Sequence, residues 1–146
     1  MTPIKSMTPS EVKIFFLKVE DNESKLGKIC STVKHHFNQR DRILITASDE
    51  TAATYIDQLL WRVPPESFIP HTIASQPINE AIVITTGLRN LNRATILINL
   101  CPNASPIIHD FQTVYELMDM TAPAKTTLSK QRYKTYEQAG CSINLI

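Results

Sequence analysis

Glycine is scarce in this chain, with three among 146 residues. A nucleotide-binding α/β protein needs glycines directly after its first strand, so that backbone amides can approach a phosphate. Here the first predicted strand is followed by Glu20, Asp21 and Asn22, which would present negative charge to that phosphate. A phosphate loop ending in Gly-Lys-Ser or Gly-Lys-Thr is also missing. The sequence therefore argues against a nucleotide site, and it predicts no cofactor.

Metal-ligand and nucleophile patterns are missing as well. Cys30, Cys101 and Cys141 are odd in number and far apart, which argues against a secreted disulfide framework and indicates a reducing compartment. His35 and His36 are adjacent, so they cannot form an i, i+4 ligand pair, and we expect the histidines to be exposed or singly hydrogen-bonded. The chain has no Gly-x-Ser-x-Gly elbow, and its carboxylates are scattered. The sequence predicts neither a metal site nor catalytic activity.

Charge and length set further bounds. The formal net charge is +1, so no global electrostatic attraction to nucleic acid is expected, and a basic site must be local. The length suits one domain, which we place at residues 12–146 after a loose tail at residues 1–11. The N-terminus does not resemble a signal peptide, and apolar runs such as residues 14–17 are too short to span a bilayer. We expect a cytoplasmic protein.

The order of predicted elements indicates an α/β fold. Apolar runs predict strands at residues 13–19, 42–47, 81–85, 94–100 and 113–118. Helical spacing predicts helices at residues 24–39, after Ser48-Asp49-Glu50, and at 123–139 before Gly140. The early β-α-β-α-β order predicts an open, mainly parallel sheet flanked by helices. Because the later strands lack intervening helices, with residues 86–92 expected to form a hairpin or short excursion, we expect a mixed sheet.

The last predicted helix has two different sides. At about 100° per residue, Tyr136 and the stem of Arg132 share one side, and Lys130, Tyr133 and Lys134 lie on the opposite side. Two ammonium groups beside an exposed aromatic ring are a plausible receptor for an acidic peptide. The alternative is an ordinary solvated helix face with one exposed tyrosine.

The stretch from Trp61 to His71 is unusually apolar for a connection. It contains the only tryptophan and three of the nine prolines. On the wheel of the second helix, Trp61 lies roughly opposite Ile56 and Leu59, so its indole should point away from that helix's core. One interpretation is a preformed docking patch, since tryptophan is enriched at interface hot spots. The other is a loop that folds back and covers the indole.

Two stretches resemble a known family. Residues 60–71 are similar to a Leu-Trp-x-x-Pro-x-Glu-Ser-Phe-x-Pro-His stretch of the chi subunit of bacterial DNA polymerase III holoenzyme. Residues 132–140 are similar to its Arg-Tyr-Lys-x-Tyr-x-x-Ala-Gly stretch, and the resemblance runs from about Lys13 to the end. It implies a Rossmann-like α/β sheet without a nucleotide site, in a non-catalytic accessory protein of the clamp-loader complex.

The resemblance also implies partners and site residues. Chi proteins join the psi subunit of the clamp loader to the acidic, phenylalanine-ending tail of the single-stranded-DNA-binding protein. By position, Tyr133 and Lys134 match the tail-binding pair, and Lys130 stands where an arginine commonly helps. Thr126 stands where a lysine is often found, and Lys125 could substitute for it.

On the second stretch, Trp61, Pro64 and Phe68 match the psi-facing surface. DNA contact is then expected to be indirect. The competing hypotheses are a small nucleotide-binding or hydrolytic α/β enzyme, which rests on element order alone, and a direct DNA binder with weak, salt-sensitive contacts.

Overall fold

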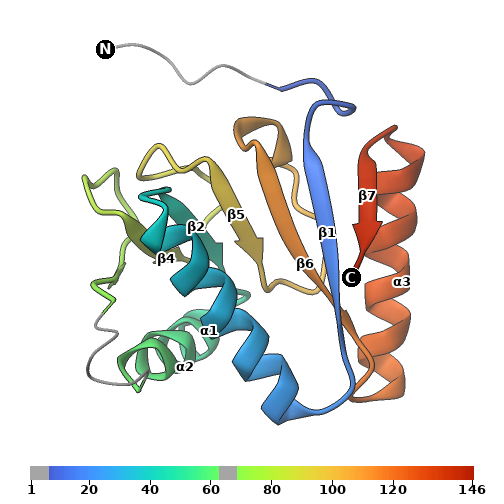
Figure 1. Cartoon of the computed structure of the whole chain (residues 1–146), viewed down its shortest axis with the longest axis horizontal. Helices are drawn as coiled ribbons and strands as arrows, with labels where there is room; N and C mark the ends of the chain where they lie inside the picture. Colours follow the sequence, from blue (N-terminus) through green and yellow to red (C-terminus); the bar gives the residue numbers. More distant parts are fainter. Residues whose placement is uncertain (1–6, 63–68) are drawn as a thin grey trace.

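The chain forms one seven-stranded sheet with helices on both sides (Figure 1). The computed structural model describes residues 7–62 and 69–146. Along the sheet the strand order is β3-β4-β2-β5-β6-β1-β7, and every pair of neighbours is parallel. The strands are β1 (Lys13–Val19), β2 (Ile43–Thr46), β3 (Thr72–Ile73), β4 (Ile82–Thr85), β5 (Ile96–Asn99), β6 (Thr113–Asp119) and β7 (Ser142–Leu145).

The helices are α1 (Asn22–Asn38), α2 (Glu50–Trp61) and α3 (Pro123–Gln138), with a short 3-10 turn at Ile108–Asp110. Asp21 and Asp49 cap the first two, since each carboxylate accepts a hydrogen bond from a first-turn amide, at 2.7 Å and 2.8 Å. After α3, Gly140 adopts a φ of +84°, which a residue with a side chain rarely tolerates. The predicted Gly140 stop is confirmed.

The direction of each crossover places the helices in two layers. The connections from β1 to β2 and from β2 to β3 both run along the sheet toward the β3 edge. The connection from β6 to β7 runs in the opposite direction, toward the β7 edge. Because such crossovers are right-handed, α1 and α2 cover one face and α3 covers the other. The cores agree: Ile43 and Ile45 pack with Ile56 of α2, whereas Leu44 packs in a separate cluster with Tyr136 of α3.

The sheet is parallel throughout, so the expectation of a mixed sheet is wrong. Of the two alternatives for residues 86–92, the hairpin is excluded and the short excursion fits, because β4 and β5 flank β2 on either side. Leu44 of β2 is in register with both Val83 and Leu97. The connection from β4 to β5 therefore passes β2 without a helix. The edge strands β3 and β7 were not predicted, since two- and four-residue strands carry little periodicity.

Smaller differences concern single side chains and the N-terminus. Tyr55, an aromatic residue of α2, is 50% exposed. Within the predicted tail, residues 1–6 lie outside the described residues, and Met7 donates a backbone hydrogen bond to His109. Among the described residues, no helix has the length and apolar character needed to cross a bilayer.

Candidate functional site

The outer face of α3 carries Lys130, Tyr133 and Lys134, as the wheel predicts. Both lysines are exposed, and neither forms an ion pair with any described residue. Tyr133 is half-buried, with its ring centroid 5.1 Å from that of Phe16 on β1 and the planes tilted by 56°. The ring is therefore less exposed than the wheel alone suggests. Packing on Phe16 holds the ring against β1, and Cys141 belongs to the same cluster.

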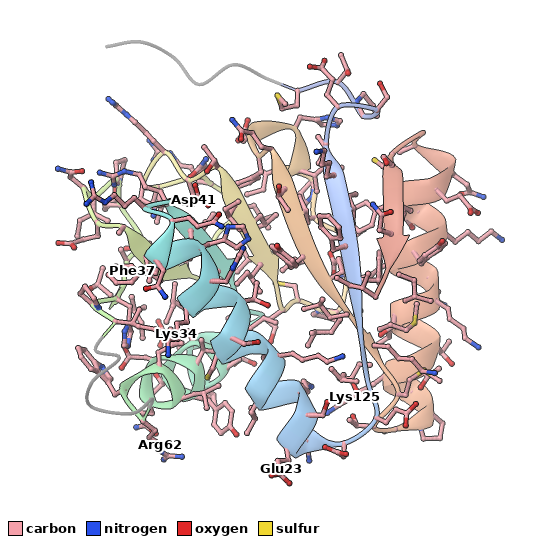
Figure 2. The ribbon with its side chains drawn as sticks, in the orientation of Figure 1. Glu23, Lys34, Phe37, Asp41, Arg62 and Lys125 are labelled. Atoms are coloured by element: carbon pink, nitrogen blue, oxygen red, sulfur yellow. The ribbon has the colours of Figure 1, made fainter. Side chains whose placement is uncertain are left out.

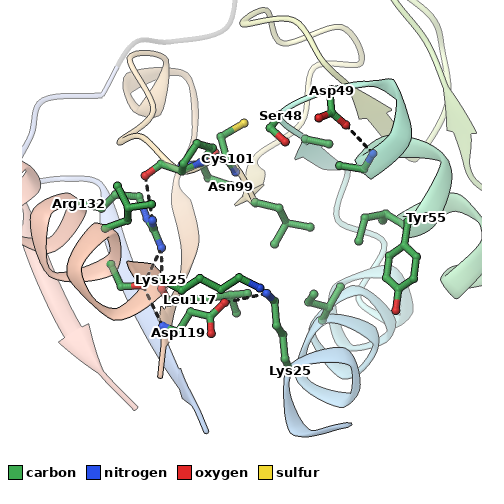
Figure 3. A pocket seen from close by; sticks show the side chains of 18 of the residues that line it. Lys25, Ser48, Asp49, Tyr55, Asn99, Cys101, Leu117, Asp119, Lys125 and Arg132 are labelled. Atoms are coloured by element: carbon green, nitrogen blue, oxygen red, sulfur yellow. Dashed lines mark hydrogen bonds and ion pairs between the residues drawn. The ribbon is translucent and has the colours of Figure 1, made fainter. Parts of the chain in front are cut away.

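Lys125 does not belong to that face. It precedes Lys134 by nine residues, which at about 100° per residue turns the two side chains about 180° apart. Figure 2 places Lys125 at the lower edge of the molecule, between α1 and α3. There it lines a pocket together with Leu128 and Arg132 (Figure 3). The structure thus brings together three of the four residues predicted for tail binding.

A buried ionic cluster anchors α3 to the sheet. Glu116, on β6, is only 1% exposed. Its carboxylate accepts hydrogen bonds from Arg132 Nε at 2.9 Å, from the Tyr136 hydroxyl at 2.5 Å and from Asn99 Nδ2 at 2.7 Å. Thr46 extends the cluster by donating to Asn99 Oδ1 at 2.9 Å. Two residues of α3 are therefore tied to a single carboxylate in the sheet.

The guanidinium of Arg132 makes three further contacts. Nη1 donates to the carbonyl of Pro102 at 3.0 Å, and Nη2 donates to the Leu117 carbonyl at 2.8 Å and to Ser129 Oγ at 3.1 Å. These bonds join α3 to the segments at the carboxyl ends of β5 and β6. Because Arg132 and Lys134 are on the same helix, the buried contacts of Arg132 also fix the position of the outer face of α3.

Electrostatics within the cluster are governed by burial. Loss of hydration raises the pKa of Glu116 to about 7, although the Arg132 charge and three hydrogen bonds act to lower it. The same burial, reinforced by the negative charge of Glu116, raises the pKa of Tyr136, so its hydroxyl stays protonated and donates. Glu116 therefore titrates near neutral pH while Tyr136 does not.

Sequence reasoning missed this cluster, although one signal was present. In β6, Val114 and Glu116 occupy alternate positions and so face the same side of the sheet. Val114 belongs to the core cluster on the α3 face. A carboxylate in phase with a core valine predicts a buried charge that needs partners.

At the far end of α2, Trp61 is 50% exposed, in agreement with its predicted direction. Its ring centroid lies 4.3 Å from that of His71. The side chain of His71 is fully buried. Its Nδ1 lies 2.7 Å from the carbonyl oxygen of Ile69, and its Nε2 lies 3.0 Å from the carbonyl oxygen of Asp57. The segment following residue 68 is thereby fastened to α2 beside the indole. Pro64 and Phe68, the other predicted members of this surface, lie outside the described residues.

The histidines and cysteines form no metal centre within residues 7–62 and 69–146. His36 differs from the expectation of an exposed or singly bonded ring. It is 7% exposed, and its ring nitrogens contact Asp41 at 2.8 Å and the Tyr115 hydroxyl at 2.7 Å. Burial raises the pKa of Tyr115, which keeps this hydroxyl protonated. The triad joins α1 to β6 as a structural clamp.

The fold and these surfaces define a class: an open α/β protein of doubly wound type, with a lysine-and-tyrosine face on its last helix and no nucleotide loop. The family model of the DNA polymerase III chi subunit, HolC, matches residues 10–144. The chain therefore belongs to the family of DNA polymerase III chi subunits. Family membership makes it an accessory subunit of a DNA replication polymerase, and it supports that hypothesis over a hydrolytic enzyme.

Three relatives that are themselves chi subunits support this family assignment. The chain is 29% identical over 119 residues to DNA polymerase III subunit chi of Escherichia coli (strain K12), covering 80% of each chain. It is 24% identical over 131 residues to the subunit chi of Pseudomonas aeruginosa, covering 90% of this chain and 92% of the relative. With the subunit chi of Haemophilus influenzae, the identity is 26% over 134 residues, covering 89% and 92%.

Proposed function

We propose that this chain is an adaptor that links the clamp loader, through its psi subunit, to the acidic C-terminal tail of single-stranded-DNA-binding protein during DNA replication in the cytoplasm. The observation that carries the proposal is the outer face of α3. Lys130 and Lys134 extend from it into solvent, on either side of a tyrosine that packs against β1. DNA is contacted only through the bound protein.

Charge and shape both suit an acidic peptide with an aromatic end. The two ammonium groups have no carboxylate partner among the described residues, so they can meet the acidic run of a tail without breaking existing ion pairs. The Tyr133 ring, held by Phe16, offers a rigid apolar wall for an aromatic side chain. Lys125 faces away from Lys134, so the proposed tail site consists of Lys130, Tyr133 and Lys134.

The second contact lies at the end of α2. Trp61 exposes half of its surface there, beside a segment that His71 fastens to the helix. We assign this surface, together with Pro64 and Phe68, to the psi subunit. It is at the opposite end of the sheet order from β7 and α3, so both partners can bind at the same time.

The tail site is tested by titration with a fluorescent peptide that carries an acidic run and a C-terminal phenylalanine. Tyr133→Ala and Lys134→Ala should each weaken binding about five- to tenfold at low salt. The Lys134 effect should shrink as salt is added, because exposed charges are screened. Lys34→Ala, an exposed lysine on α1, is the matched control and should bind as the wild type does.

The two surfaces are separated by measuring both partners with the same variants. Trp61→Ala should abolish co-purification with the clamp loader while the peptide affinity stays within twofold of wild type. Unchanged peptide binding by both Tyr133→Ala and Lys134→Ala would contradict the tail site. Joint loss of peptide and clamp-loader binding in Trp61→Ala would show that the tryptophan supports the fold.

A further inference from the structure

A pocket of about 640 Å³ lies at the carboxyl edge of the sheet, away from both proposed protein contacts (Figure 3). It is bounded by α1, α2 and α3. Its rim is formed where the strands end, at Ala47 after β2, at Leu100 after β5 and at Asp119 of β6. A volume of this size is in the range of small-molecule sites, about 300–1,000 Å³.

The topology explains why a pocket forms there. β2 and β5 are neighbours, but their connections leave in opposite directions. After β2 the chain enters α2, which packs on the α1 side, and after β5 it runs through Ile108 and Phe111, which pack in the cluster on the α3 side. Parallel sheets bind ligands in the crevice at such a switch point, because the two departing connections leave a gap between them.

The walls of the pocket are mostly apolar. Ile29, Ile56 and Leu117 are nearly fully buried in the fold, and their side chains still border the open space. Leu26, Leu100 and Leu128 also belong to this lining. An apolar ligand body would remove these surfaces from water, which favours binding.

The polar groups of the pocket leave one charge without a partner. Lys25 is paired with Asp119 at 2.7 Å, and hydrogen bonds from Lys25 and Thr121 lower the pKa of that aspartate even though burial acts to raise it. Arg132 is held by Glu116. Asp49 caps α2, where the helix dipole offsets its charge.

Lys125 is the exception. It has no ion pair with any described residue, and Figure 3 shows its side chain converging with that of Lys25 on the middle of the pocket. Two ammonium groups thus approach Asp119, whose carboxylate already pairs with Lys25, and the other carboxylate of the pocket, Asp49, caps α2. The local charge favours an anion at this point.

We propose that this pocket binds a small organic monoanion, with an apolar body in the crevice and its carboxylate or sulfonate group on Lys125. A polyphosphate does not fit the same charges. Only one cation is uncompensated, and the carboxylates of Asp49 and Asp119 at the rim repel further negative charge.

The test uses two probes with the same ring system. 8-Anilinonaphthalene-1-sulfonate carries one sulfonate, and N-phenyl-1-naphthylamine lacks it. Both should bind the wild type, and their affinities are measured by fluorescence titration at low salt. Lys125→Met keeps most of the apolar stem and removes the charge, so it should weaken the sulfonate about fivefold and leave the neutral probe unchanged. Lys34→Met on α1 is the matched control for loss of a positive charge.

A second variant tests the crevice itself. Ala52→Phe places a ring in the pocket from α2 and should weaken both probes at least tenfold, while the cooperative urea transition confirms that the variant is folded. In 15N-labelled wild-type protein, the sulfonate should shift the amide signals of residues 47–52 and 99–101. Equal effects of Lys125→Met on both probes, unchanged binding by Ala52→Phe, or signal shifts confined to Tyr133 and β7 would each overturn the proposal.

Discussion

Replacing Arg132 with methionine should destabilise the protein far more at pH 8 than at pH 5. In the wild type the guanidinium is the cation nearest the buried Glu116 carboxylate, with Nε and Oε1 2.9 Å apart. Methionine fills a similar volume but supplies neither charge nor donor. The variant therefore leaves a carboxylate in the sheet with only neutral partners, Tyr136 and Asn99.

The magnitude follows from the titration of Glu116. Its pKa of about 7 in the folded protein, against 4.5 ordinarily, means that the native state keeps a proton which the unfolded state releases. The wild-type free energy of unfolding should accordingly fall as pH rises from about 4.5 to 7, by about 3 kcal/mol from this group. Without Arg132 the pKa rises further, because the stabilising positive charge is gone.

At pH 5 Glu116 is protonated with or without Arg132, and the variant loses only the hydrogen bonds of the guanidinium, about 1–3 kcal/mol. At pH 8 the wild type holds an ion pair, and the variant must bury a lone carboxylate or keep it protonated. Breaking a buried pair in this way costs about 3–5 kcal/mol.

The assay is urea denaturation followed by circular dichroism at both pH values. Three proteins are compared with the wild type: Arg132→Met, the double variant Arg132→Met/Glu116→Gln, and the exposed control Lys34→Met. The double variant has no titrating group in the cluster, so its free energy of unfolding should lack the fall between pH 5 and pH 8 that Glu116 causes in Lys34→Met. A cost of Arg132→Met that is equal at pH 5 and pH 8 would refute the assigned charge state of Glu116.

Two further stability predictions follow from the loops that frame the binding surfaces. Gly140→Ala should lower the free energy of unfolding by about 1 kcal/mol, because φ is +84° there and nothing else crowds the position; urea titration beside Gly27→Ala, in open space on α1, checks this. His71→Ala should cost about 1–3 kcal/mol in the same assay, since the buried ring holds Ile69 to Asp57. A His71→Ala cost below about 0.5 kcal/mol would contradict that anchoring role.

Local pattern was sufficient for several features of the candidate site. Helical periodicity separates the buried Arg132 and Tyr136 from the outward Lys130 and Lys134, because a side chain's direction on a helix depends only on its position in the repeat. The same arithmetic turns Lys125 away from Lys134, although the family resemblance had grouped the two.

Sequence periodicity did not predict contacts between residues that are far apart in the chain. Tyr133 was expected to be exposed, and its packing on Phe16 joins residues 117 positions apart that only the fold brings together. Apolar periodicity likewise cannot distinguish a hairpin from two strands that flank a third, which is why the sequence left the connection between β4 and β5 open. His36 was misjudged for a similar reason, since its partner Tyr115 lies on β6.

The sequence by itself determined the α/β class, most element boundaries, the two faces of α3 and the family, because these depend on local spacing and on motifs. Tertiary structure alone decided the all-parallel strand order, the partners of Glu116 and the pocket at the carboxyl edge. Each of these requires knowing which strands are neighbours. Strand pairing is a nonlocal choice made by the packing of the whole sheet, and no segment of the chain specifies it alone.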